Sequence, residues 1–293
     1  MQQFRRIDEV RNALEPFRAE RRPIGLVPTM GALHRGHGTL IETARAQNDT
    51  VVVSIFVNPT QFGDTGDLDN YPRTLEADLE LCRAIGVDMV FLPMVSDMYA
   101  EGEQTSVCVE PLGSDLIGRQ RTGHFRGVTT VVSKLFNIVQ PSRAYFGEKD
   151  FQQLGIIRRM VSDLFVPVEI VGVPTVRDAD GLALSSRNAR LDPAERAASV
   201  VLSKALMLGA ALIEAGETEP EAVLSPMRAM IEAEPLADLK SLDIRSARHL
   251  DPVERIGEEP VVILVTAQFG SVLLIDQREA RASGAGTQGE SGR

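Results

Sequence analysis

Residues 27–37 read VPTMGALHRGH, and this stretch sets the most direct constraint on the fold. It overlaps the end of an apolar run, Ile24–Pro28, and leads into Gly36–Gln47, where apolar residues recur every three to four positions. A strand that passes through a glycine-containing loop into a helix is typical of a strand-helix-strand unit. Because such units align their strands in parallel, the stretch predicts a loop at the carboxyl edge of a parallel sheet, where α/β proteins bind ligands.

Further apolar runs and amphipathic stretches extend this alternation along the chain. The other expected strands are Thr50–Phe56, Asp88–Leu92, Arg143–Phe146 and Val168–Val173, with an extra short strand at Val107–Glu110. The other expected helices are Thr74–Ile85, Gly127–Ile138 and Phe151–Leu164. The alternation predicts an α/β fold in which residues 1–176 form a Rossmann-like, parallel-sheet domain.

The pattern changes after about residue 177, which predicts a second, smaller α+β domain over residues 177–280. Helices are expected at Pro193–Ala215 and Thr218–Glu234, and an antiparallel pair of strands at Val261–Ala267 and Ser271–Asp276. Residues 281–293 are rich in Gly, Ser and Ala and contain no core-forming residue, so we expect a disordered tail.

Composition limits the partners and the compartment. The 293 residues carry 31 Lys and Arg against 41 Asp and Glu, a net charge of −10, which disfavours binding to a nucleic-acid backbone. The strongest apolar runs are much shorter than the roughly 20 residues that span a bilayer. Two cysteines and no secretory signal at the N-terminus favour a cytoplasmic protein without a membrane or nucleic-acid partner. An anionic ligand would therefore need a local site.

The first loop offers such a site. His34 and His37 are three positions apart around Gly36, so both rings can face the start of the following helix. Helix N-termini carry unpaired N–H groups and the positive end of the helix dipole, which favours a phosphate ligand. Two alternatives remain at this point: a zinc site, for which the loop has no third ligand, and a plain helix-start turn.

Other polar residues follow the later strands. Gln61 could bond hydroxyl and carboxylate groups, and Lys149 and Asp150 could contact phosphate and ribose. Ser185-Ser186-Arg187 could clamp a polyphosphate. Read alone, each has a plainer interpretation: an exposed amide, a solvated charged loop and a helix cap.

Taken together, six segments in order resemble the pantoate-beta-alanine ligases, members of the nucleotidyltransferase superfamily with a His-x-Gly-His signature. The segments are Pro28–His34, Phe56–Phe62, Tyr71–Thr74, Gly123–Phe125, Tyr145–Asp150 and Ser185–Asn188. Two departures stand out: Leu184 replaces the usual Met, and Gly38 stands where a larger residue is common. We expect little consequence from Leu184 if it binds through its backbone, whereas Gly38 would loosen the first helical turn.

The resemblance implies a reaction. It joins (R)-pantoate to β-alanine, with cleavage of ATP to AMP and pyrophosphate, through a pantoyl adenylate. It also implies a homodimer and Mg²⁺ that arrives with ATP and is held mainly by its phosphates.

The resemblance also implies which residues act. The expected catalytic residues are His37, His34, Lys149 and Arg187. ATP is expected to contact Met30, Gly31, Ala32, Leu33, His34, Arg35, Gly36, His37, Gly147, Glu148, Lys149, Asp150, Val176, Leu184, Ser185, Ser186 and Arg187. Pantoate and β-alanine are expected at Gln61, Gln153 and Asn58, and Asp78 is the expected protein contact of the metal.

Two other functions compete with this one. A related nucleotidyltransferase that moves AMP onto a phosphate would need a basic pocket where this chain has the amides of Gln61 and Gln153. A catalytically silent nucleotide sensor would not need all of His34, His37 and Lys149.

Overall fold

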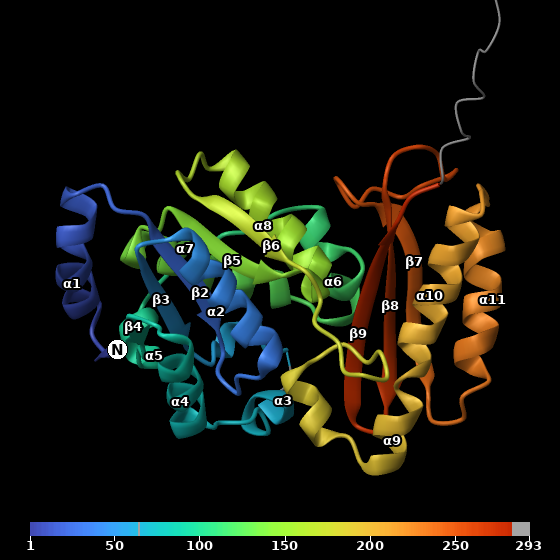
Figure 1. The fold of residues 1–293 in the computed structure, drawn as a ribbon, viewed down its shortest axis with the longest axis horizontal. Coiled ribbons are helices and arrows are strands. Elements are labelled where there is room, and N and C mark those ends of the chain that lie inside the picture. Colours follow the sequence, from blue (N-terminus) through green and yellow to red (C-terminus); the bar gives the residue numbers. More distant parts are fainter. Residues whose placement is uncertain (64, 283–293) are drawn as a thin grey trace, which may run out of the picture. The chain divides into compact units, whose positions relative to one another are not determined.

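The computed structural model describes residues 1–63 and 65–282 (Figure 1). The chain forms two compact units. Unit 1 consists of Met1–Val176 and Leu184–Ser186, and unit 2 of Arg177–Ala183 and the chain from Arg187 onward. The chain therefore passes from one unit to the other after residues 176, 183 and 186. From residue 283 on, the expected tail lies outside the described residues.

Unit 1 contains a six-stranded sheet in which every pairing is parallel, in the order β1-β4-β3-β2-β5-β6. The strands are β1 (Gln2–Phe4), β2 (Ile24–Thr29), β3 (Thr50–Ile55), β4 (Met89–Phe91), β5 (Arg143–Gly147) and β6 (Glu169–Val173). The Rossmann-like fold is confirmed, and the five main strands agree with the sequence expectation to within one residue at each end. The three-residue edge strand β1 was not predicted.

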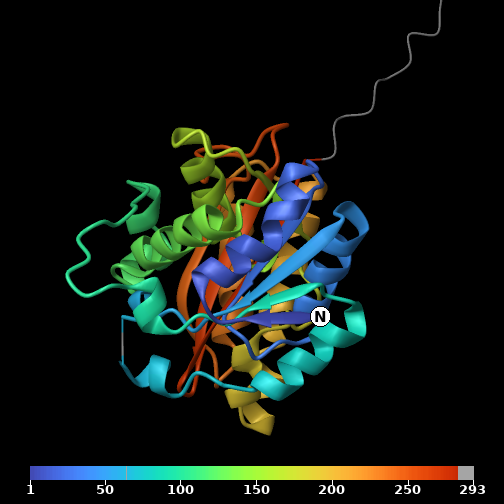
Figure 2. The same ribbon diagram turned by 90° about the vertical axis from the view of Figure 1, so that its left-hand side faces the viewer.

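Helices cover both faces of this sheet (Figure 2). One layer contains α1 (Ile7–Ala19), α7 (His124–Val139) and α8 (Phe151–Asp163), which share a core with β2 and β5. The other contains α2 (Arg35–Gln47) and α4 (Leu75–Ile85). Shorter helices lie in the connections: η1 (Pro59–Gln61), α3 (Thr65–Asp69), α5 (Val95–Met98), η2 (Leu112–Ser114), α6 (Ile117–Gln120) and η3 (Glu148–Asp150).

The strand order determines where a ligand can bind. From β2 the sheet continues to β3 on one side and to β5 on the other, so the order reverses at this point. In open parallel sheets, ligands bind beyond the carboxyl ends of the strands at such a switch point. The loops after β2 and β5, which carry His34 and Lys149, are the loops at this position.

The strand expected at Val107–Glu110 is wrong. This stretch is extended but pairs with no strand of the described chain. Its backbone bonds the side chains of α7 instead: the Val107 N–H donates to the Thr130 hydroxyl (3.0 Å), and its carbonyl accepts from the Thr129 hydroxyl (2.6 Å). The β-branched pattern reflects packing on a helix rather than on a sheet.

Unit 2 is a small α+β domain, as expected. Its antiparallel sheet is β7 (Asp238–Ser246), β8 (Val261–Phe269) and β9 (Val272–Ala280), and β7 was not predicted. The helices are α9 (Pro193–Ala198), α10 (Val201–Glu214) and α11 (Pro220–Glu232), after the short η4 (Ser186–Arg190). The single helix expected at Pro193–Ala215 is interrupted at residues 199 and 200.

The turn at 177–183 is firmly attached to unit 2. The Arg177 guanidinium forms a two-point ion pair with Asp276 on β9 (2.7 and 3.0 Å), and the Asp276 side chain is 2% exposed.

By length and composition alone, Pro193–Glu214 could span a membrane. More than half of its most apolar window is buried in the protein, as in many core helices, so this is weak evidence for a membrane span.

Candidate active site

Asp78 on α4 holds the loop after β2 in its shape. Gly31 and Ala32 both adopt left-handed backbone conformations, with φ of 81° and 49°. The buried Asp78 carboxylate accepts from the N–H groups of Ala32 (3.0 Å) and Leu33 (2.8 Å) and from the Thr74 hydroxyl (3.0 Å). Position 31 requires glycine, because a Cβ would lie 3.0 Å from this carboxylate and would be strained at that φ.

His34 and His37 orient each other's rings at the start of α2. His34 Nδ1 accepts a hydrogen bond from the Gly36 N–H (3.1 Å), and His37 Nδ1 accepts one from the His34 N–H (3.3 Å). The ring centroids are 4.2 Å apart. A neutral imidazole whose Nδ1 is an acceptor carries its proton on Nε2. In their neutral forms, both rings therefore present an Nε2–H donor.

His37 is neutral at physiological pH. The pKa of His37 is lowered to about 3, chiefly by burial; His34 and Lys149 also lower it, while Asp150 opposes the shift. Without a ligand, the His37 ring can therefore donate a hydrogen bond but carries no positive charge. The influence of Lys149 and Asp150 on this ring also shows that the loops after β2 and β5 lie close together.

Gly36 makes room for the His34 ring. A Cβ at position 36 would lie 2.9 Å from His34 Cε1 and 3.0 Å from its Nδ1. The sequence suggested that N–H groups at the helix start would bind phosphate. Those of Ala32, Leu33, His34 and Gly36 all bond within the protein. A phosphate at this loop would therefore meet the imidazole donors rather than these N–H groups.

The loop after β5 contributes a cation and open space. Lys149 Nζ lies 3.7 Å from an Asp150 carboxylate oxygen, and the Lys149 side chain is mostly buried. A Cβ at Gly147 would meet no described atom within 4 Å, so a ligand can approach the backbone there. The Glu148 carboxylate instead lies beside Gly172 of β6.

Asn58 and Gln61 form a buried pair after β3. Asn58 Nδ2 donates to Gln61 Oε1 (3.0 Å) and to the Gly127 carbonyl (3.1 Å). Gln61 Nε2 donates to Met30 Sδ (3.1 Å), which ties η1 to the loop after β2. Asn58 is only 1% exposed and its amide groups are all bonded, so the geometry favours a supporting function for it. Gln61 is 8% exposed, and its Nε2 donates to a thioether, a weak acceptor, so Gln61 is the better candidate for a ligand contact.

Two glutamines at the start of α8 have different environments. Gln152 is buried and bonds the backbone of Leu112, Asp115 and Ile117, so it holds the loop that contains η2. Gln153, the residue expected at the substrate, is partly exposed, and its side chain bonds no other described residue. It is thus available to a ligand, whereas Gln152 is not.

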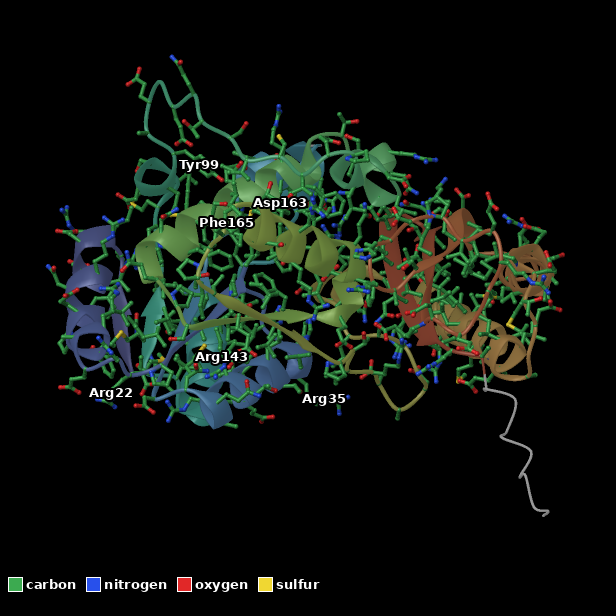
Figure 3. The ribbon with its side chains drawn as sticks, turned by 90° about the horizontal axis from the view of Figure 1, so that it is seen from above. Arg22, Arg35, Tyr99, Arg143, Asp163 and Phe165 are labelled. Atoms are coloured by element: carbon green, nitrogen blue, oxygen red, sulfur yellow. The ribbon has the colours of Figure 1, made fainter. Side chains whose placement is uncertain are left out.

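The segment Leu184–Ser186 belongs to unit 1 and lies against the loop after β2. The Ser186 hydroxyl donates to the Ala32 carbonyl (3.2 Å), and the Leu184 N–H donates to the Val176 carbonyl (2.9 Å). Arg187 belongs to unit 2. Arg35, at the first position of α2, is exposed (Figure 3).

The described residues contain no group of three or more His, Cys, Asp or Glu side chains that could hold a metal ion. Asp78, the expected metal contact, already uses both oxygens to hold backbone and hydroxyl donors. Its geometry favours support of the loop, and metal contact at Asp78 stays a prediction.

A comparison with models of known protein families tests the resemblance found in the sequence. The model of the family "Pantoate-beta-alanine ligase" matches residues 2–279. The chain belongs to the pantoate-beta-alanine ligase family. The ATP-dependent condensation of pantoate with β-alanine is the reaction of this family of ligases.

Relatives and solved structures agree with this membership. A pantothenate synthetase of Aquifex aeolicus is 52% identical over 275 residues, 93% of this chain and 96% of that protein. The crystal structure of the pantoate-beta-alanine ligase of Thermus thermophilus has a TM-score of 0.90 at 46% identity, covering 95% of this chain and 99% of that one. The Francisella tularensis pantoate-beta-alanine ligase, complexed with β-γ ATP and β-alanine, has a TM-score of 0.79 at 32% identity and covers 95% and 97%.

Sequence reasoning missed three supporting residues of this pantoate-beta-alanine ligase site. Asp78 was expected to contact the metal, and its bonds to the first loop span 46 and 45 positions. His124, whose Nδ1 lies 2.8 Å from the Gln61 carbonyl, falls in a recognised segment whose sequence left a ligand contact and a surface charge patch equally open. Tyr99, which donates to Asn58, lies in none of the six recognised segments.

Proposed function

We propose that this chain condenses (R)-pantoate with β-alanine in two steps. In the first, a pantoate carboxylate oxygen attacks the α-phosphorus of ATP and pyrophosphate leaves, which gives pantoyl adenylate. In the second, the β-alanine amine attacks the acyl carbon and AMP leaves. The observation that carries the proposal is the His34–His37 pair, with both Nδ1 atoms bonded to backbone N–H groups at the switch point of the sheet.

The two imidazoles are the proposed donors to ATP phosphates. Preorganised donors stabilise charge as it develops in a transition state, and they cost no reorganisation at that moment. Lys149 would add a positive charge at the same place. Gly147 and Asp150 are proposed to hold the ribose, and the Val176 backbone to meet the adenine.

Gln61 and Gln153 are the proposed contacts of pantoate, with Gln61 also near β-alanine. Gln61 presents its N–H₂ group beside Met30, and thioether sulfur is a weak acceptor that an oxygen can readily replace. Asn58 would act through Gln61. The amides also distinguish this proposal from transfer of AMP onto a phosphate acceptor, which would favour basic side chains there.

Leu184–Arg187 are proposed to close over the phosphates. Exclusion of water would protect the pantoyl adenylate, a mixed anhydride that hydrolyses readily when water reaches it. The contact of Ser186 with Ala32 supports this, because it joins the segment to the loop that carries both histidines.

Magnesium fits this proposal as an ion held mainly by the ATP phosphates. Mg²⁺ keeps several waters and commonly binds through phosphates with only one or two carboxylates. The described residues offer no larger acidic cluster. We also propose a homodimer and a cytoplasmic enzyme. Two unpaired cysteines are consistent with a reducing compartment.

A rapid-quench experiment tests the first step. With ATP, Mg²⁺ and pantoate but no β-alanine, about one equivalent of pyrophosphate per site should form and then stop. His37→Ala should slow this burst by about 10²- to 10³-fold, the usual effect of losing one preorganised donor. His249→Ala, which removes an exposed histidine of unit 2, is the matched control and should leave the burst unchanged.

Absence of pyrophosphate until β-alanine is added would rule out a separate adenylation step. A burst that does not depend on pantoate would contradict the proposed substrate.

A further inference from the structure

Tyr99 lies directly after α5, in a part of the chain without a recognised motif (Figure 3). Its hydroxyl donates to Asn58 Oδ1 (2.7 Å) and lies 3.1 Å from the Thr60 hydroxyl. Lys134 Nζ lies 4.3 Å from the centre of the Tyr99 ring and bonds both the Met98 carbonyl and the Glu103 carboxylate. Lys134 therefore contacts one face of the Tyr99 ring, while the Tyr99 hydroxyl points to Asn58.

Backbone groups decide which way the Asn58 amide faces. Asn58 Oδ1 accepts from the Thr60 N–H (3.3 Å), and Nδ2 donates to the Gly127 carbonyl (3.1 Å). Reversal of the amide would place two donors together at Thr60 and two acceptors together at Gly127. The Tyr99 and Thr60 hydroxyls reinforce the observed orientation, because both donate to Asn58 Oδ1.

The orientation of Asn58 sets that of Gln61. The remaining Nδ2 proton of Asn58 needs an acceptor, and Gln61 Oε1 supplies it at 3.0 Å. Gln61 must then direct its N–H₂ group to the other side, where it meets Met30 Sδ. The Gln61 backbone is fixed as well: its carbonyl lies 2.8 Å from His124 Nδ1, and a Cβ at Gly127 would lie 2.6 Å from its nitrogen.

We propose that Tyr99 is a positioning residue: through Asn58 it holds the Gln61 amide with its N–H₂ group toward the ligand. The site then selects an acceptor oxygen, as pantoate carries in its carboxylate and hydroxyl groups. The inference rests on the proposed function in one respect, that pantoate is the ligand of Gln61. Burial raises the pKa of Tyr99, so its hydroxyl keeps the proton that it donates.

Tyr99→Phe removes this donor and keeps the ring contacts with Lys134 and Phe56. We expect the KM for pantoate to rise about three- to tenfold, the usual effect of losing one buried hydrogen bond. The KM for ATP should stay within about twofold, because neither imidazole depends on Tyr99. Thr60→Val, which removes the second hydroxyl donor to Asn58, should give a smaller effect in the same direction.

Tyr145→Phe is the matched control. Tyr145 on β5 is also buried, and its hydroxyl bonds Asn48 (2.6 Å) and Gln47 (3.0 Å), at the end of α2 away from the histidines. Loss of this hydroxyl should lower the melting temperature without a selective change in the KM for pantoate. A selective change in Tyr99→Phe that is absent from Tyr145→Phe supports the proposal.

Gln61→Ala separates failure of the inference from failure of the proposed function. Suppose that Gln61→Ala raises the KM for pantoate. If Tyr99→Phe then leaves this KM unchanged, or raises the KM values for pantoate and ATP equally, the positioning role of Tyr99 is overturned and the proposed function stands. If Gln61→Ala leaves the KM for pantoate unchanged, the assignment of Gln61 to pantoate fails. In ¹⁵N spectra, an unshifted Gln61 side-chain amide signal in Tyr99→Phe would also overturn the inference, without reference to activity.

Discussion

At the scale of single residues, this site depends on side chains that hold other side chains. His37 is the clearest case, because its Nδ1 accepts from the His34 backbone while burial keeps the ring neutral. The same neutral ring that is proposed to donate to a ligand would resist protonation in acid. The stability of the protein should therefore depend on pH through this residue.

The free energy of unfolding should fall in acid partly because of His37. The pKa of His37 in the folded protein is about 3, below the ordinary value of 6.5. When the pKa of a group is lower in the folded protein than in the unfolded chain, its contribution to stability is complete at a pH above the unfolded-state pKa. This contribution is lost as the pH falls toward the folded-state pKa. His37→Gln keeps a side-chain N–H but does not titrate. Urea titrations between about pH 7 and pH 4 should show a steeper loss for the wild type than for the variant.

Parallel stability profiles for the two proteins would contradict this expectation. Asp150, which opposes the shift, supplies a control: Asp150→Asn should leave the steeper slope of the wild type in place, because the carboxylate only raises the His37 pKa.

Individual residues also show where sequence reasoning ends. His34, Lys149 and Gln61 were found because each lies just after an expected strand, and parallel strands place such residues at one edge. Asp78 and Tyr99 carry no such signal. Asp78 looks like an ordinary acid in the first turn of a helix, which the helix dipole favours. Its bonds to Ala32 and Leu33 exist only because α4 packs beside the first loop.

At the scale of elements, the first turn of α2 contains two glycines with different constraints. The space beside the Gly36 Cα is occupied by the neighbouring His34 ring. A Cβ at Gly38, in contrast, would lie 3.4 Å from the flexible end of Ile85, which is an ordinary contact. The sequence comparison suggested that Gly38 loosens this turn. The geometry indicates that alanine would fit at this position.

We expect opposite results from the two alanine substitutions. Gly38→Ala should stabilise the protein by about 0.5–1 kcal/mol, because alanine loses less backbone entropy in a helix, and thermal unfolding should show a higher midpoint. Gly36→Ala should displace the His34 ring and slow adenylation by about 10²-fold, since small misplacements of catalytic groups have effects of this size.

A Gly36→Ala enzyme with normal adenylation, or a Gly38→Ala protein that melts earlier than the wild type, would show that these contacts do not control the turn.

Helices and strands were predicted correctly where the hydrophobic pattern of a segment matches its burial in the fold, and wrongly where the two differ. The interior strands of unit 1 are continuous apolar runs, as expected for strands covered by helices on both faces. Val107–Glu110 has similar chemistry but bonds two threonine hydroxyls of α7, a partner that periodicity cannot reveal. The edge strand β1 has only three residues, too few for a periodic signal.

At the scale of the whole molecule, the expected homodimer can be tested directly. One apolar face of β7–β9 packs against α10 and α11 within unit 2, so this face does not supply a free surface. Leu164 and Phe165 in unit 1 are 54% and 90% exposed, and Phe165 is labelled in Figure 3. Sedimentation equilibrium at micromolar concentration should give twice the chain mass of 31.9 kDa. A single species of the chain mass would contradict the dimer.

The course of the chain between its two units limits how this enzyme can be recombined, in evolution or in the laboratory. An exchange of gene fragments at Val176 would deliver unit 1 without Leu184–Ser186, and thus without the hydroxyl that bonds the Ala32 carbonyl. An exchange after Ser186 would carry Arg177 away from Asp276, its partner in unit 2. Within the described chain no single crossover point yields both units intact, so the two units must be inherited as one block.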